Sequence, residues 1–426
     1  MVRDNKNSFQ FIPVLGSRSS VKDKLVPLLS VVIPTRNRIK YAISAIESIL
    51  TFTTDIRLEL VVQDNSDSRE LQQYVDENIR DNRLRYNYTS TTLAYIQNFD
   101  KAIALSKGEY ICIIGDDDGI NPEIMSAVCW AKEKGVDVIS VMGNPFYLWP
   151  GTDIKSTIFT KIEGGLLRIP EPFDGSFRPF DVILNVKKYL QTNVSGSEIQ
   201  FARLYHGIVR RSCLEQIFVR TGSYMKGLCP DIYASMVLSE VAKNAFVTSY
   251  PLTISGACNA SATVESMTGK HEGALDRAIH LRGLNGYTWD VLVPRFYSPE
   301  TIWADSALAA LRHIGRADLV ASFNVARFSA LCFARYRRHG ITAIRGMYKG
   351  SNSLHKNNIQ TTALFLYYLL LDTPIFLARR IYNRLRIFCI GEGVVRIRGL
   401  CDMIEVTRTL IDYLKKKGKS IDQFLS

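Results

Sequence analysis

A short apolar run that ends in three consecutive aspartates constrains this sequence more than any other feature. Residues 110–114 (YICII) show no helical period and are bounded by glycines, which is typical of a buried strand. Asp116, Asp117 and Asp118 follow after one glycine. Because unpaired adjacent carboxylates are costly to bury, we expect a cation beside them. Mg²⁺ or Mn²⁺ suits their hard oxygen ligands, and phosphate oxygens would complete the coordination shell.

The position of these acids after a strand favours a ligand site over a solvated acidic turn, which is the plain alternative. Residues 121–123 (NPE) open a helix, with proline near its first turn. Acids between a strand and a helix lie at the carboxyl edge of the sheet, where open α/β folds bind ligands. An EF-hand fits poorly, because no glutamate occupies the twelfth loop position. The stretch therefore predicts a site for a metal and a nucleoside diphosphate.

Strands and helices alternate after residue 27. Strand-like segments occupy 28–34, 58–63, 84–88 and 109–114, and helical periods occupy 42–50, 69–79 and 99–105 between them. This alternation predicts a doubly wound α/β sheet. Three of the strands end in polar clusters, PTRNR, QDNSD and GDDD, and parallel strands would place these clusters at one edge.

Neither a Walker A loop nor a G-x-G-x-x-G fingerprint occurs in the sequence. Phosphates would therefore be held by a metal and by basic side chains, and Arg36 and Arg38 are placed for this role. The alternative is that both arginines are solvated loop residues. The later stretch 143–182 is expected to be a long loop, long enough to act as a lid.

Four motifs in order resemble family 2 glycosyltransferases of the GT-A fold: VVIPTRNR (31–38), VVQDNS (61–66), NFDKAIALSKGEYI (98–111) and GDDDGINP (115–122). The resemblance covers residues 28–260 and implies a Rossmann-like doubly wound sheet of the nucleotide-diphospho-sugar transferase type. It implies that Thr35 lies beside the nucleotide, that Asp64 accepts a hydrogen bond from the base, and that the acidic cluster carries Mn or Mg. The implied donor-binding residues are Pro34, Thr35, Arg36, Asn37, Arg38, Asp64, Asn98, Asp116 and Asp117, and the implied metal ligands are Asp116, Asp117 and Asp118.

The acidic motif departs from the family pattern at one position. Many members have Asp-x-Asp-Asp, and alignment on Pro122 places Gly115 where the first aspartate would be. The literal Asp-x-Asp is Asp116 and Asp118, whereas the alignment favours Asp117 as the main ligand. Which of the three aspartates binds directly stays open at this point.

The expected general base is Asp231. Attack by an acceptor hydroxyl needs a carboxylate within hydrogen-bond reach, and in family 2 enzymes an Asp in this place, usually preceded by Glu, performs an inverting displacement. Here Pro230 precedes it. Asp231 also begins a predicted helix, so its alternative role is an N-cap. Lys270 and His271 are further candidates for contact with a phosphate.

Length and pattern divide the 426 residues into a leader (1–27), a GT-A domain (28–274) and a helical C-terminal domain (275–426). In the last, the apolar segment 363–371 is too short to span a membrane. It runs into a basic stretch formed by Arg379, Arg380, Arg384 and Arg386. Such a helix suits a membrane surface, and the alternative is a buried bundle helix with a solvated basic face. The lysine-rich tail helix at 403–414 has the same two interpretations, and a dimer interface is a further use of this region.

The formal net charge of +12 and the pI of about 9.2 favour anionic partners. The eight cysteines form no C-x-x-C pair, which argues against a zinc ribbon and for a reducing compartment. No continuous apolar segment resembles a signal peptide. We therefore expect a cytoplasmic protein, with the inner face of the cell membrane as a peripheral location.

The sequence predicts a metal-dependent inverting glycosyltransferase that moves a sugar from a nucleotide sugar to a hydroxyl of a glycan or lipid-linked acceptor in bacterial surface polysaccharide synthesis. A UDP-sugar is the first choice of donor, with GDP- and dTDP-sugars as alternatives. A catalytically degenerate partner subunit and a sugar nucleotidyltransferase are the competing interpretations. Nucleic-acid binding is not expected, because acids converge at the strand ends and the basic runs lie elsewhere.

Overall fold

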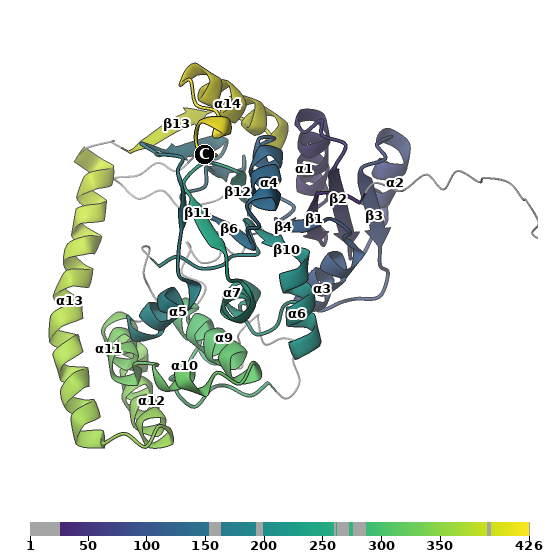
Figure 1. Cartoon of the computed structure of the whole chain (residues 1–426). Coiled ribbons are helices and arrows are strands. Elements are labelled where there is room, and N and C mark those ends of the chain that lie inside the picture. Colours follow the sequence, from purple (N-terminus) through teal and green to yellow (C-terminus); the bar gives the residue numbers. More distant parts are fainter. Residues whose placement is uncertain are drawn as a thin grey trace, which may run out of the picture.

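The computed structural model describes residues 26–152, 163–192, 199–259, 261, 272–275, 287–389 and 393–425, and Figure 1 shows their arrangement. Residues 1–25 of the predicted leader lie outside these ranges. So do Lys270 and His271, the two candidates for phosphate contact.

Four parallel strands form one half of the main sheet. They are β1 (Leu29–Thr35), β2 (Leu58–Asp64), β3 (Leu84–Tyr88) and β4 (Tyr110–Ile113), adjacent in the order β3-β2-β1-β4. The register pairs Thr35 with Asp64 and Asp64 with Tyr88, so the polar ends of the strands lie at one edge. The sheet continues through β10 (Gly207–Arg210), β6 (Val138–Val141), β11 (Ala245–Thr248) and β9 (Phe177–Pro179). β10 is antiparallel to both of its neighbours.

Helices cover both faces of this sheet because its strands are apolar on both sides. In β1, Val31 and Ile33 pack into one buried cluster, and Val32 packs into the other. The first cluster contains α1 (Ile39–Phe52), α2 (Glu70–Asn78) and α4 (Ile124–Glu133). The second contains α3 (Tyr95–Leu105), α5 (Val182–Gln191), α6 (Arg211–Thr221) and α7 (Pro230–Val241).

A second sheet lies where a long loop was expected. Its strands, in spatial order, are β13 (Val394–Arg398), β8 (Leu166–Pro170), β7 (Phe146–Leu148), β12 (Thr253–Ala257) and β5 (Gly119–Ile120). The prediction of an irregular stretch over 143–182 is therefore wrong, since β7, β8 and β9 lie within it. The last strand, β5, directly follows the three aspartates and pairs with β12. The second sheet therefore holds one end of the acidic loop in place.

The helical region shares a hydrophobic core with the main sheet. It comprises α9 (Pro299–His313), α10 (Ala317–Ala321), α11 (Val325–Arg335), η3 (Arg337–His339), α12 (Gly340–Ser353) and α13 (Asn358–Cys389). One hydrophobic cluster extends from Val32 in β1 to Phe365 in α13. These helices therefore pack directly on the α7 side of the sheet (Figure 1). Among the described residues, no helix has the length and apolar character needed to cross a membrane.

The end of the chain returns to the N-terminal half. β13 pairs with β8, and α14 (Met403–Lys416) packs on α1 and is followed by η4 (Ile421–Gln423). Ser48 donates a hydrogen bond of 2.8 Å to Thr407 Oγ1, and the Met403 amide donates to Ser44 Oγ at 2.9 Å. Of the predicted region 275–426, residues 394–425 therefore pack with the N-terminal half of the chain.

Candidate active site

The ends of β1 and β2 and the loop after β4 meet at one edge of the sheet, as the sequence predicts. The Thr35 hydroxyl donates a hydrogen bond of 2.6 Å to Oδ2 of Asp116. Asn98 in α3 donates to the Thr35 carbonyl oxygen at 3.1 Å. Asp64 is the register partner of Thr35. The structure therefore brings together four of the predicted donor-binding residues.

Asp64 is fully buried, and protein donors fix its carboxylate. Oδ1 accepts from the Ser66 amide at 2.8 Å, and Oδ2 accepts from the Tyr86 hydroxyl at 2.6 Å. Burial and the Asp64 carboxylate both raise the pKa of Tyr86, so the phenol stays a donor. The carboxylate is thus held in one orientation at the sheet edge.

The two arginines of the PTRNR motif have different surroundings. The Arg36 side chain is 40% exposed and forms an ion pair of 3.2 Å with the exposed Asp67. Asn37 follows with φ of 56°, a backbone conformation that asparagine tolerates better than most residues. After this turn the Arg38 side chain is partly buried. Pro34, within β1, is buried. An incoming phosphate can therefore reach Arg36 more readily than Arg38.

Arg38 lies between two of the three aspartates. Its Nη1 is 2.7 Å from Asp116 Oδ1, and its Nη2 is 2.7 Å from Asp117 Oδ2. The same Nη2 lies 2.7 Å from Cys258 Sγ in the segment after β12. Burial lowers the pKa of Arg38, but the two carboxylates outweigh this effect and raise it. Arg38 is therefore the internal counter-ion of the acidic loop.

Asp118 points away from this pair and into the protein. Its Oδ2 accepts hydrogen bonds from the Gly115 amide at 2.6 Å and from the Tyr205 hydroxyl at 2.7 Å. His206 Nε2 lies 3.1 Å from the same oxygen. Oδ1 accepts from the Gly256 amide in β12 at 2.6 Å. Both oxygens of Asp118 are thus occupied, and the residue anchors the loop to the second sheet.

Burial raises the pKa values of the other two aspartates. Burial is the largest cause for both, neighbouring carboxylates add to it, and Arg38 opposes it. The pKa of Asp116 rises to about 7 and that of Asp117 to about 6. Burial acts on Asp118 as well, but His206 and the surrounding donors outweigh it and lower the pKa. The single positive charge of Arg38 therefore does not neutralise both carboxylates when Asp116 and Asp117 are ionised.

These two residues fit a divalent cation, whereas Asp118 does not. Within the described ranges, no three His, Cys, Asp or Glu side chains are grouped so as to hold a metal ion. Of the three predicted ligands, Asp118 is the least available, because its two oxygens contact four protein groups, whereas Asp116 and Asp117 share the charge of one guanidinium. Asp116 and Asp117 retain surplus negative charge and hard oxygen atoms. A cation with few protein ligands, completed by a diphosphate, matches this donor set.

The structure explains the glycine that departs from the family motif. A Cβ atom on Gly115 would lie 2.7 Å from the Tyr205 hydroxyl and 2.9 Å from Asp118 Oδ2. An aspartate at this position is therefore incompatible with the inward turn of Asp118. Gly256 is constrained in the same way, since a Cβ there would lie 1.8 Å from the Asp117 carbonyl oxygen.

Asp231 lies in the first turn of α7, after Pro230 at the first helical position. The N-cap residue is Cys229, and no side chain caps this end. The alternative role of Asp231 as an N-cap is therefore wrong. In the part of the chain that the structure describes, no donor is bonded to its carboxylate, and the side chain is exposed.

Although solvent reaches Asp231, protein surrounds it closely enough to change its acidity. Burial raises its pKa to about 6, His206 and Arg203 oppose this effect, and Asp118 adds to it. The charges of Asp231 and Asp116 both act on the hydroxyl of Tyr95. Asp231 and Asp116 are therefore both near enough to the Tyr95 hydroxyl for their charges to raise its pKa.

Sequence reasoning missed Tyr205, His206 and Cys258. Tyr205 and His206 directly precede β10, and His206 has a positive φ of 55°. Its Nδ1 lies 3.0 Å from Thr253 Oγ1, so the ring bridges β12 and Asp118. No local motif marks these residues; their partners are distant in sequence, and only the folded sheet brings them together.

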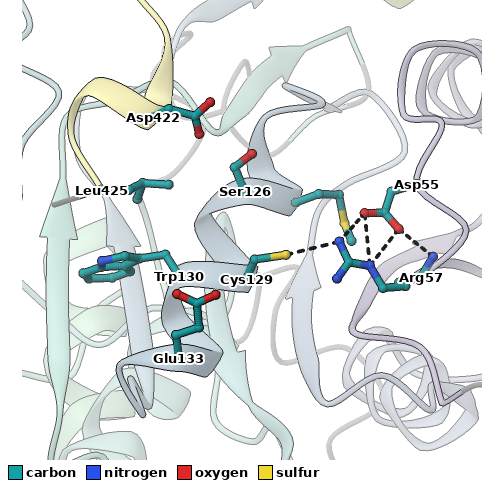
Figure 2. A pocket seen from close by; sticks show the side chains of 9 residues that line it. Asp55, Arg57, Ser126, Cys129, Trp130, Glu133, Asp422 and Leu425 are labelled. Atoms are coloured by element: carbon teal, nitrogen blue, oxygen red, sulfur yellow. Dashed lines mark hydrogen bonds and ion pairs between the residues drawn. The ribbon is translucent and has the colours of Figure 1, made fainter.

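A hollow of about 300 Å³ lies apart from this site (Figure 2). Its lining comes from α4, the segment before β2 and the end of the chain, and it includes Cys129, Trp130 and Asp422. Arg57 donates to Cys129 Sγ at 3.2 Å and pairs with Asp55 at 2.7 Å. None of the predicted site residues lines it, so the hollow does not belong to the candidate active site.

The fold and the site define an α/β domain with an acidic loop at the carboxyl edge of its parallel strands, as in proteins that bind nucleoside diphosphates. Residues 30–218 match the sequence model of Glycosyl transferase family 2. Residues 30–218 therefore resemble a family 2 glycosyltransferase domain, and the predicted α/β fold with an additional helical region is confirmed.

Two curated relatives each match about a third of the chain. The putative colanic acid biosynthesis glycosyl transferase WcaA of Escherichia coli K12 is 35% identical over 121 residues, which are 28% of this chain and 43% of WcaA. The abequosyltransferase RfbV of Salmonella typhimurium is 28% identical over 149 residues, 31% of this chain and 44% of RfbV. The chain thus spans less than half the length of these relatives.

Solved structures show a weaker similarity over a longer range. Staphylococcus aureus TarS 1–349 in complex with UDP-GlcNAc has a TM-score of 0.46 and 14% identity, over 82% of this chain and 91% of that one. The mannosyltransferase PcManGT from Pyrobaculum calidifontis, in complex with GDP-Man and Mn²⁺, has a TM-score of 0.37 and 15% identity, over 81% and 85%.

Proposed function

We propose that this protein is an inverting glycosyltransferase that moves a sugar from a nucleotide sugar to a hydroxyl of a glycan or lipid-linked acceptor. The family match and the names of the relatives support the class of reaction. The proposal is carried by the meeting of Thr35, Asp64 and Asp116 at one sheet edge, and the influence of both Asp231 and Asp116 on the Tyr95 hydroxyl supports the role of Asp231. The name of WcaA supports a surface polysaccharide as the acceptor.

In this proposal the donor lies across the edge of the sheet. Asp64 receives a hydrogen bond from the base, on the oxygen lone pairs that Ser66 and Tyr86 leave open. Arg36 is exposed and binds the diphosphate, while Arg38 stays with the aspartates. We propose a UDP-sugar as the donor, with GDP- and dTDP-sugars as alternatives.

Asp116 and Asp117 would hold a Mn²⁺ or Mg²⁺ ion, which neutralises charge on the departing diphosphate when it is bound. Asp118 has a different task, because it fixes the loop through Tyr205, His206 and the backbone. The hydrogen bonds of Asp118 thereby fix the turn from which the neighbouring carboxylates of Asp116 and Asp117 extend.

Asp231 acts as the general base. With a pKa of about 6 it is mostly ionised at neutral pH, yet more basic than an ordinary aspartate. As the acceptor oxygen bonds to the anomeric carbon, Asp231 takes the hydroxyl proton and the bond to the diphosphate oxygen breaks with its electron pair. A single displacement of this kind inverts the anomeric configuration.

A thermal-shift panel of UDP, GDP and dTDP, with and without Mn²⁺ or Mg²⁺, tests the proposal, since a ligand of the folded state raises the melting temperature. We expect one nucleotide to give a metal-dependent shift that Asp117→Asn removes. The matched control is Asp412→Asn, an exposed aspartate on α14 that should leave the shift unchanged. The absence of a shift with every nucleotide would overturn the donor site and favour a partner subunit without catalytic function.

A further inference from the structure

The long helix α13 (Asn358–Cys389) has one face packed against the protein. Phe365 is buried in the core, and Asp372 pairs with Arg327 of α11 at 2.7 Å. Near the start of the helix, the Thr361 and Ser351 hydroxyls lie 2.8 Å apart. In Figure 1 the helix runs along one margin of the molecule, beside α11 and α12 at its first half. One face of α13 is therefore fixed by packing.

The opposite face of α13 is apolar and exposed. Eight of the sixteen large hydrophobic side chains that are exposed among the described residues belong to this helix: Ile359, Leu364, Leu366, Tyr367, Leu370, Leu371, Ile375 and Tyr382. At 100° per residue, five of these positions lie at least about 100° from both Phe365 and Asp372, namely Ile359, Leu366, Tyr367, Leu370 and Leu371, and the other three flank this outward side. A soluble protein rarely leaves so many apolar side chains on one element without a function.

This outward face also lacks charge. Between Ile359 and Ala378, Asp372 is the only charged residue, and it lies on the packed side with Arg327. With a rise of about 1.5 Å per residue, the apolar surface from Ile359 to Tyr382 is about 35 Å long. An ordinary surface helix would carry polar and charged side chains there.

The sequence of the helix becomes basic where the apolar face ends. Arg379, Arg380, Arg384 and Arg386 occur within eight positions, and residues 373–389 include no acidic residue. β13 follows with exposed Arg396 and Arg398. An extended apolar surface continuous with a basic segment matches an anionic lipid surface, where acyl chains and charged headgroups lie side by side.

We propose that α13 docks this protein on an anionic membrane, with its outward face in the boundary between headgroups and acyl chains. A second copy of the chain is the other apolar partner to consider. Two helices packed side by side in parallel would bring two basic segments together, whereas anionic lipid neutralises them. The proposal is independent of the proposed function, since it would stand if the active site were inactive.

The test is co-sedimentation of the full chain with phosphatidylcholine vesicles, with and without phosphatidylglycerol. We expect binding only when phosphatidylglycerol is present, and weaker binding as salt is added. Leu366→Glu/Leu370→Glu, at side chains 52% and 76% exposed, should reduce the bound fraction at least about tenfold without changing the melting temperature. The matched control, Ile56→Glu/Val219→Glu, changes two side chains outside α13 that are 78% and 84% exposed, and it should bind like the wild type.

A second variant separates charge from apolar contact. Arg379→Gln/Arg380→Gln should weaken binding to phosphatidylglycerol vesicles and reduce its salt dependence. The proposal is overturned if the wild type does not bind anionic vesicles. It is also overturned if Leu366→Glu/Leu370→Glu and the control Ile56→Glu/Val219→Glu bind these vesicles equally. A dimer in sedimentation velocity that Leu366→Glu/Leu370→Glu dissociates, without vesicle binding by the wild type, would assign the face to a second copy instead.

Discussion

Replacement of Arg38 by glutamine should destabilise the protein in a manner that depends strongly on pH. Arg38 contacts one oxygen of Asp116 and one of Asp117, whose side chains are only 2% and 5% exposed. Removing one partner of a buried ion pair leaves an uncompensated charge and costs about 3–5 kcal/mol. We expect the Arg38→Gln variant to lose that amount of unfolding free energy at about pH 8, where both carboxylates are charged.

The loss should shrink in acid. The folded-state pKa values, about 7 for Asp116 and about 6 for Asp117, lie above the usual aspartate value. A raised pKa means that stability from these groups is full at low pH and declines as pH rises through 6 to 7. At about pH 5 both are mostly protonated in the folded state, so Arg38 contributes little there.

Urea unfolding of the wild type and the variant at both pH values measures this difference. The control is Arg57→Gln, which removes a half-exposed pair with Asp55 and should cost at most about 1 kcal/mol at either pH. Equal losses for Arg38→Gln at the two pH values, or a loss below about 1 kcal/mol at the higher one, would refute Arg38 as the counter-ion of the acidic loop.

Two further predictions concern the base and the end of the chain. Asp231→Asn should slow sugar transfer by about 10²–10⁴-fold while leaving binding of the nucleoside diphosphate unchanged, as steady-state rates and a parallel binding titration would show. In the wild type, the transfer rate should fall as pH drops below about 6, because Asp231 becomes protonated; a flat profile there would argue against it as the base. Met403→Ala should lower the unfolding free energy by about 2–5 kcal/mol, because this fully buried side chain packs against Gly119 beside the acidic loop. Unaltered urea unfolding would show that α14 is only loosely attached.

The sequence predicts the parallel half of the sheet well because its signals are local. Three of the first four strands are short apolar runs that end in polar clusters, and the helices between the strands carry a clear period. The predicted strand at 84–88 coincides with β3, and that at 58–63 differs from β2 by one residue. Parallel pairing then places Thr35 and Asp64 at the same edge without further information.

The second sheet is not predicted from the sequence because its strands pair with strands that are distant along the chain. β8 pairs with β13, so Leu167 lies opposite Ile397 although about half the chain separates them. β7 has three residues and β5 has two, too few for a period to appear. The lysines at the end of α14 suggest a membrane surface in the sequence, whereas the apolar side of that helix, including Leu410, packs in the same cluster as α1.

Within the site, the sequence identifies which residues gather and leaves open what each one contacts. Three adjacent aspartates are expected to share a metal. In the structure, Asp118 instead accepts hydrogen bonds from the Tyr205 hydroxyl and the Gly256 amide, on the side away from Asp116 and Asp117. Arg38 is expected to bind phosphate and instead neutralises two carboxylates. The partners of each side chain depend on which donors and acceptors the fold brings near it, and the spacing of residues along the chain does not predict these partners.

The central claim is that a nucleoside diphosphate binds where β1, β2 and the acidic loop meet. Calorimetric titration of the preferred nucleotide, with Mn²⁺ present, into the wild type, Asp117→Asn and Asp412→Asn tests it most directly. The account predicts a dissociation constant at least about tenfold weaker for Asp117→Asn, equivalent to about 1.4 kcal/mol, and no change for Asp412→Asn. Equal affinity in all three proteins would place the nucleotide elsewhere and contradict the account.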